Sequence, residues 1–171
     1  YDTFGNVKRQ EIARYSDDDM GTPLDYKLIT NSYYSSGVEA IRGWLDTSKV
    51  TTWIGVDTAT FIDRQEVDYD GYNDVFGNAD YQYVTRYTDA THSTVFDYKT
   101  ITSTYDKYER QGWADTSKIS WLLSAGGTWV DYQEVSYNEY DTFGNVKRQE
   151  IARYSDDTTD TPLDYKLITN S

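Results

Sequence analysis

The sequence predicts an all-β fold of antiparallel strands connected in a meander. Runs rich in Val, Ile, Thr, Tyr and Trp suit a half-buried sheet surface. Clusters of Asp, Asn and Gly separate these runs and are typical of tight turns. A long segment also returns almost unchanged later in the chain, which is typical of a repeat protein.

The repeat has a period of 139 residues. Residues 1–18 return letter for letter as residues 140–157, and identity resumes at residues 22–32, which match residues 161–171. In total, 29 of the 32 overlapping positions are identical. The chain begins and ends inside a repeat, so we expect it to belong to a longer array.

A weaker repeat divides this period into two halves. The segment DYKLIT at residues 25–30 matches DYKTIT at residues 97–102, an offset of 72 that shortens to 68 further along the chain. The sequence therefore predicts three parts, namely unit A (residues 1–71), a diverged unit B (residues 72–139) and the first half of another unit A (residues 140–171).

Composition limits the class of protein. With 37% hydrophobic and 16% aromatic residues, the chain is patterned enough to fold despite a net charge of −13. The excess of 29 acidic over 16 basic residues argues against nucleic acid as a partner. No run is apolar enough for a membrane span. The absence of cysteine excludes disulfides and thiolate chemistry, and an acidic, Cys-free, Tyr-rich repeat fits an exported bacterial protein.

Four strands per unit are the simplest interpretation. In unit A, β-branched and aromatic residues predict strands at residues 7–15, 26–34, 49–56 and 60–69. Turn signals fall between and after them, at residues 16–23, 42–49, 57–60 and 70–78, and unit B has matching signals at residues 88–94 and 124–128. The segment at residues 35–44 is the one tolerable helix candidate. Its unit B counterpart has no apolar stripe at helical spacing, so we expect irregular structure or strand there.

A Tyr-Asp, Phe-Gly-Asn core recurs along the chain. YDTFGN occurs at residues 1–6 and 140–145, and the spaced variant YDGYNDVFGN at residues 69–78. Gly and Asn suit a positive-φ turn, and the Asp carboxylate can accept hydrogen bonds from turn amides. The predicted turn residues are Tyr1, Asp2, Phe4, Gly5, Asn6, Phe76, Gly77, Asn78, Tyr140, Asp141, Phe143, Gly144 and Asn145.

This core is similar to the YD repeat of the Rhs family, whose members commonly carry Y-D-x-x-G-[NR] followed by a strand that ends in an aromatic residue. The W-x-D-T-S-K-[VI] segments at residues 44–50 and 113–119 also resemble linkers between such repeats. The resemblance covers most of the chain. It implies successive hairpins that coil into a β-spiral or solenoid, which forms a hollow shell in toxin complexes, Rhs toxins and teneurins.

No residue pattern predicts an enzyme or a cofactor. His92 is the single histidine and lies in a predicted turn without a G-x-S-x-G motif, so a surface-loop role is favoured over catalysis.

Calcium is the metal that the acidic residues suggest. Asp68, Asp70, Asn73 and Asp74 present oxygen ligands at spacings that resemble a calcium loop. The EF-hand pattern is not met, because Gly71 comes too early and no Glu occupies the twelfth position. Solvated acids that form a turn are the favoured interpretation, so we expect no metal.

The aromatic residues allow a second kind of binding. Among 18 Tyr and five Trp, Trp44 and Trp113 lie in matching turn-like segments, where exposed rings would contact glycans. The alternative is that these rings fill the sheet surface.

The repeat itself suggests the function. We expect a structural segment of a long extracellular or cell-surface bacterial protein, a fibre, sheath or stalk whose partners are further copies of its own repeat. The alternatives are the shell of an Rhs or toxin-complex polypeptide around an effector, and a glycan-binding adhesin.

Overall fold

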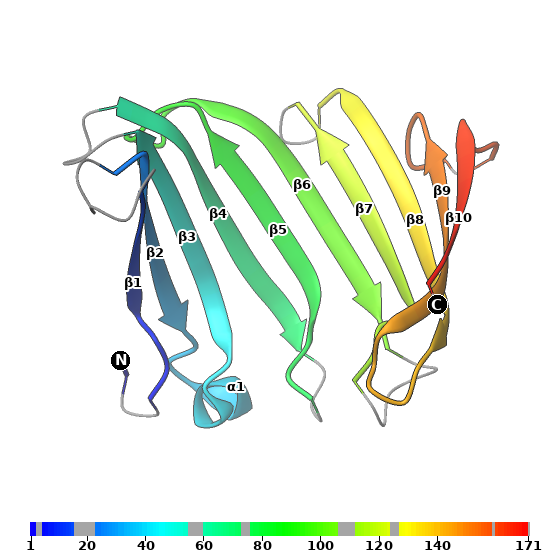
Figure 1. Ribbon diagram of the computed structural model, residues 1–171, viewed down its shortest axis with the longest axis horizontal. Coiled ribbons are helices and arrows are strands. Elements are labelled where there is room, and N and C mark those ends of the chain that lie inside the picture. Colours follow the sequence, from blue (N-terminus) through cyan, green and yellow to red (C-terminus); the bar gives the residue numbers. More distant parts are fainter. Residues whose placement is uncertain are drawn as a thin grey trace. The chain divides into compact units, whose positions relative to one another are not determined.

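The computed structural model describes residues 1–2, 5–15, 23–54, 60–72, 76–105, 112–123, 127–158 and 160–170. Within these residues the chain forms ten strands and one short helix (Figure 1). The elements are β1 (Arg9–Arg14), β2 (Asp25–Tyr33), α1 (Gly37–Arg42), β3 (Leu45–Ile54), β4 (Thr60–Tyr72), β5 (Ala79–Tyr87), β6 (Val95–Thr104), β7 (Thr116–Leu122), β8 (Trp129–Tyr140), β9 (Val146–Tyr154) and β10 (Asp164–Thr169).

The strands form one antiparallel sheet in sequence order, from β1 to β10. The all-β meander predicted from the sequence is therefore confirmed. The predicted number of strands is also confirmed, because β1 to β4 derive from unit A and β5 to β8 from unit B, apart from one residue at the end of β4 and of β8. Residues of the repeated half of unit A form β9 and β10.

Two compact units can be distinguished along the chain. The first contains residues 1–68 and 84–97, and in it β1 pairs with β2, β2 with β3, and β3 with β4. The second contains residues 69–83 and 98–171, and in it β6 to β10 pair in succession. Bulges interrupt the register in both, for example between Thr52 and Trp53 in β3.

Burial in the sheet is modest. Among the described hydrophobic residues, Ala79, Tyr132 and Val135 are buried, with 6–8% of their surface exposed. Several polar residues are equally buried, including Ser48, Asp97 and Asp131. Backbone pairing and cross-strand polar contacts therefore take a larger share in this fold than a deep apolar core does.

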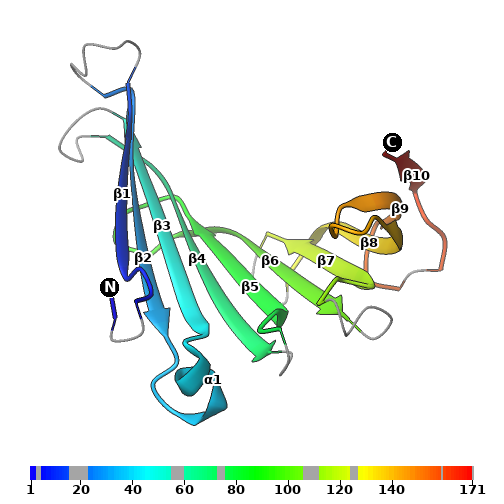
Figure 2. The same cartoon turned by 60° about the horizontal axis from the view of Figure 1, so that its bottom comes forward.

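The prediction for residues 35–44 is wrong, because residues 37–42 form the helix α1. Figure 2 shows α1 between the end of β2 and the start of β3. Gly43 ends the helix in the left-handed conformation with φ of 67°, and its N–H donates to the carbonyl of Ala40. Glu39 in the first turn and Arg42 in the last turn suit the helix dipole. Residues 37–43 therefore contain the charges and the terminal glycine of a helix, which the comparison with unit B did not reveal.

The predicted turn at residues 42–49 is also partly wrong, since β3 already begins at Leu45. The hydroxyl groups in this polar segment have partners on neighbouring strands. Ser48 Oγ donates to Asn31 Oδ1 at 2.9 Å, and Thr47 Oγ1 donates to Asp68 Oδ1 at 3.2 Å. The first residues of the predicted turn at residues 70–78 are likewise strand, because β4 continues to Tyr72. The signals at residues 16–22, 57–59, 73–75 and 124–126 lie outside the described residues.

Candidate functional site

The Asp and Asn of the Tyr-Asp turn make the same hydrogen bonds in its two complete copies. At the first copy, Asp2 Oδ1 accepts a hydrogen bond from the backbone N–H of Asn6 at 2.8 Å, and Asp2 Oδ2 accepts one from Asn6 Nδ2 at 2.9 Å. At the second copy, Asp141 makes the same two bonds with Asn145, both at 2.9 Å. The turn is therefore a local structure that the short motif itself determines.

Backbone bonds complete this turn. The N–H of Gly5 donates to the carbonyl of Asp2 at 3.2 Å, and Gly144 donates to Asp141 at the same distance. Both glycines have positive φ, 85° and 87°, which favours glycine over any L residue. The donors from Asn145 hold the pKa of the Asp141 carboxyl below its usual value. Of the two phenylalanines in this motif, Phe143 is exposed and Phe4 lies outside the described residues.

The middle copy of the motif contributes a link to the next hairpin. Gly77 has a φ of 71°, and Asn78 Nδ2 donates to the carbonyl of Gly112 at 2.7 Å. A Cβ atom on Gly112 would lie 2.6 Å from the ring of Phe76, so this glycine allows a close approach of the phenylalanine. The first copy makes a longer version of the link, with Asn6 Nδ2 donating to the carbonyl of Gly43 at 3.4 Å.

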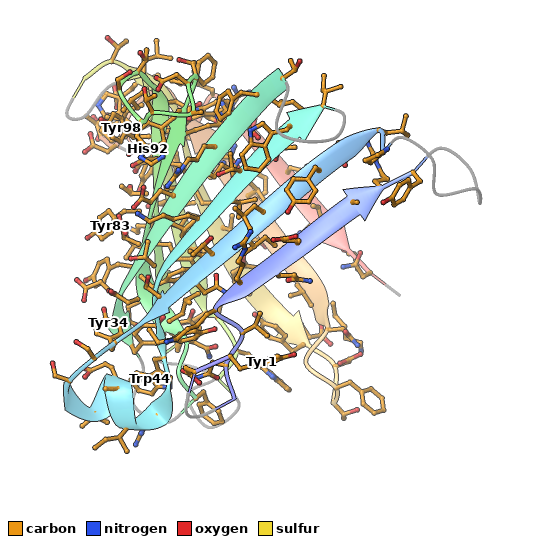
Figure 3. The ribbon with its side chains drawn as sticks, turned by 90° about the vertical axis from the view of Figure 1, so that its left-hand side faces the viewer. Tyr1, Tyr34, Trp44, Tyr83, His92 and Tyr98 are labelled. Atoms are coloured by element: carbon orange, nitrogen blue, oxygen red, sulfur yellow. The ribbon has the colours of Figure 1, made fainter. Side chains whose placement is uncertain are left out.

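The predicted glycan residues lie directly after these linking glycines. Trp113 stacks on Tyr140, with ring centroids 5.0 Å apart, and also lies against Gly144. Tyr140 Oη donates to the carbonyl of Ala114 at 2.6 Å. Trp44 is half-buried, with the Arg42 guanidinium 5.1 Å from its ring centre. In Figure 3, Trp44 lies beside α1. A glycan-binding role for Trp44 and Trp113 stays a prediction.

Tyrosine hydroxyls form a second recurring link that the sequence analysis missed. Tyr33 Oη donates to the carbonyl of Val7 at 2.9 Å, and Tyr105 Oη donates to that of Ala79 at 3.3 Å. Both pairs are separated by 26 residues, and the second lies 72 residues after the first. The 72-residue offset is therefore the signal in the sequence that aligns these two tyrosines.

Ion pairs recur at equivalent positions. An Arg–Asp pair joins two adjacent strands in each copy of the first hairpin, and a Lys–Glu pair joins the third strand to the fourth in both units. The pairs are Arg14–Asp25, Arg86–Asp97 and Arg153–Asp164, and Lys49–Glu66 and Lys118–Glu134. They repeat one pattern of cross-strand charge along the chain.

Of the four candidate calcium ligands, two lie in a strand and two lie outside the described residues. Asp68 and Asp70 belong to β4, where Asp68 accepts a bond from Thr47 and Asp70 accepts one from the N–H of Gly71 at 2.8 Å. Asn73 and Asp74 lie outside the described residues. Within the part of the chain that the structure describes, no three His, Asp or Glu side chains are grouped as metal ligands.

His92 lies in the turn between β5 and β6, with a φ of 61° and its ring 5.3 Å from that of Tyr87. The turn is organised by Asp89, whose carboxylate accepts bonds from the N–H groups of Thr91, Ser93 and Thr94. The Thr91 hydroxyl also donates to it, and these donors hold the pKa of Asp89 well below its usual range.

Comparisons of the chain with protein-family models, curated proteins and solved structures found no match. Among the described residues, no helix is both long and apolar enough to span a membrane. The links between successive hairpins recur at equivalent positions of the described residues.

Proposed function

We propose that this chain is a structural repeat segment of a long extracellular or cell-surface bacterial protein, and not an enzyme. In this proposal, strand pairing continues from copy to copy and builds a fibre, sheath or stalk. The observation that carries the proposal is the recurrence of the same links at the repeat offset, above all the Tyr33 and Tyr105 hydroxyl bonds. One contact geometry applied repeatedly generates an open helical array when its rotation does not close.

Near-identity at 29 of the 32 positions that overlap at the 139-residue period favours a fibre over a shell. A closed shell needs units that differ along the chain, so that its ends taper and seal. A fibre needs units that stay the same. The Tyr-Asp turns support a relationship with the YD-repeat family, and the proposal includes the spiral coiling expected from it. The net charge of −13 would keep neighbouring fibres apart in solution.

Electron microscopy of the native material tests this proposal. We expect filaments rather than capsules. Eight strands, β1 to β8, derive from one 139-residue period. If strands stack roughly 4.8 Å apart along the fibre, the axial repeat is about 38 Å or a small fraction of it. Closed capsules around an effector would contradict the fibre and support the shell.

A further inference from the structure

β1 and β9 have the same sequence in two different environments. Residues 7–15 recur as residues 146–154, yet β9 has a neighbour on each side, whereas β1 pairs with β2 alone among the described strands. All six residues of β1 are exposed, while four of the six matching residues in β9 are half-buried. Ile12 in β1 is 41% exposed, and its equivalent Ile151 is half-buried. β1 therefore lies at the edge of the sheet, although its sequence is that of the interior strand β9.

The strand that covers β9 is β8, and its register is known. Val135 lies opposite Ile151, and Gln133 lies opposite Arg153. β8 also supplies Val135 and Tyr132, two of the buried hydrophobic residues. The ring of Tyr132 lies 5.9 Å from that of Tyr154. Pairing with β8 thus adds both a hydrogen-bonded ladder and apolar contacts to the sequence shared by β1 and β9.

The charged groups differ between β1 and β9 in the same way. Arg153 reaches the buried Asp131 of β8 at 2.8 Å in addition to Asp164. Its equivalent in β1, Arg14, bridges to Asp25, and its side chain is 70% exposed against 46% for Arg153.

Tyr140 stacks on Trp113, but its equivalent Tyr1 is 86% exposed. A Cβ on Gly144 would meet Trp113 at 2.8 Å, whereas one on Gly5 would meet nothing within 4 Å. Tyr1 and Gly5 therefore have the sequence of the covered turn at Tyr140 and Gly144, but no neighbouring ring of the described residues covers them.

We propose that the outer edge of β1, together with this turn, docks β8 of a second copy of the chain in the register of the β8–β9 pair. Ile12 then lies opposite Val135 of the second copy, and Arg14 bridges to Asp131 of the second copy. The outer edge of β10 does not fit β1 in this way, because β10 repeats β2, whose other neighbour is β3. The inference rests on the proposed pairing between copies and specifies the residues at the junction.

Docking requires that the resident β9 leave β8, and the duplicated sequence allows β9 to be weakened without changing β1. The N–H of Asn170 donates to the carbonyl of Lys147, so in this register Ile151 bonds to β10 and the N–H of Ala152 faces β8. Ala152→Pro therefore removes a backbone N–H from the β8 side of β9 and disfavours its pairing with β8. We expect this full-length variant to form head-to-tail multimers in size-exclusion chromatography with light scattering, while the unmodified chain stays monomeric. Ala13→Pro combined with Ala152→Pro is the matched control and stays monomeric. A folded, monomeric Ala152→Pro variant would overturn the proposal, as would equal multimers in the control.

Disulfide trapping tests the register without the proline. The chain has no cysteine, so Ile12→Cys with Val135→Cys introduces the only thiols. Oxidation of the concentrated protein traps brief openings of β9, and we expect disulfide-linked dimers and longer species on a non-reducing gel. Ala13→Cys with Val135→Cys puts one thiol on the opposite face of β1, so about ten-fold less product is expected.

Equal or absent cross-linking in the two cysteine pairs would overturn the docking register, even if the proline variant does not fold. The proposed function fails separately. Filaments of native material without this cross-link would retain the fibre and reject the junction, whereas capsules with the cross-link would retain the junction and reject the fibre.

Discussion

Gly5 and Gly144 occupy the same position of the same turn, with φ of 85° and 87°. An L side chain at this φ costs roughly 1–2 kcal/mol, so both positions disfavour alanine. Only Gly144 has a neighbour in the way, since a Cβ there would lie 2.8 Å from Trp113 Nε1. We expect Gly5→Ala to lower the free energy of unfolding by about 1 kcal/mol and Gly144→Ala by about 2 kcal/mol or more. Urea unfolding measures both, and equal losses would contradict the stacking of Trp113 on this turn.

Asp141 gives the turn a defined response to acid. Hydrogen bonds from Asn145 stabilise the carboxylate, so its pKa in the folded chain lies below that in the unfolded chain. A lowered pKa means that the contribution to stability is complete above the unfolded value and is lost as the pH falls through the folded one. We expect the Asp141–Asn145 bonds to be intact at neutral pH and to be lost only below about pH 4.

Chemical shifts of the Asn145 amides, followed by NMR from neutral to acid pH, measure this loss. Asp141→Asn is the control and should remove the titration. A midpoint above about 3.9, the ordinary value for Asp, would contradict the lowered pKa.

The Arg–Asp pair between the first two strands of each repeat is buried to different degrees in different copies, and its contribution to stability should differ accordingly. The Asp97 side chain is 7% exposed in its pair with Arg86, whereas that of Asp164 is 61% exposed in its pair with Arg153. Neutralising a buried partner leaves a desolvated guanidinium without its carboxylate, while an exposed pair contributes little. We expect Asp97→Asn to reduce the free energy of unfolding by about 2 kcal/mol and Asp164→Asn by less than about 0.5 kcal/mol. Urea denaturation of both variants measures the difference, and similar losses would show that burial does not set the strength of this pair.

The number of strands could be predicted from the sequence because β-branched and aromatic runs alternate with turn signals over the whole period. The start of β3 could not be predicted, since the polar residues there resemble a turn. Ser48 and its equivalent Ser117 bond to Asn31 and Ser103 on the adjacent strand, and only the register reveals these partners. α1 was missed for a related reason, because the left-handed Gly43 that ends it has the same sequence signature as a loop glycine.

In the candidate site, too, the local contacts could be predicted from the sequence and the long-range contacts could not. The Asp2–Asn6 bonds span four residues, so short-range turn chemistry was enough to expect them. The stacking of Trp113 on Tyr140 joins residues 27 apart, and the bond from Tyr105 to Ala79 joins residues 26 apart. Contacts of this kind depend on how strands align, which the pattern of one strand does not specify.

For the whole molecule, the repeat predicts that stability grows with the number of copies. In a repeat protein, stability is approximately the sum of unit terms and nearest-neighbour interface terms, and the end units lack one interface. A longer polypeptide, in which an extra copy of residues 1–139 is fused to the N-terminus of the whole chain, would give the original β1 a β8 neighbour. The fusion would also cover Ile12, which is 41% exposed in the single chain.

We expect this longer polypeptide to unfold at a higher urea concentration than the single chain. The same polypeptide with Ala13→Pro at the junction copy is the control and should lose most of that gain, because the N–H of residue 13 faces the new strand and not β2. Equal midpoints for all three would mean that the copies fold independently, and the strand pairing proposed between them would then be wrong.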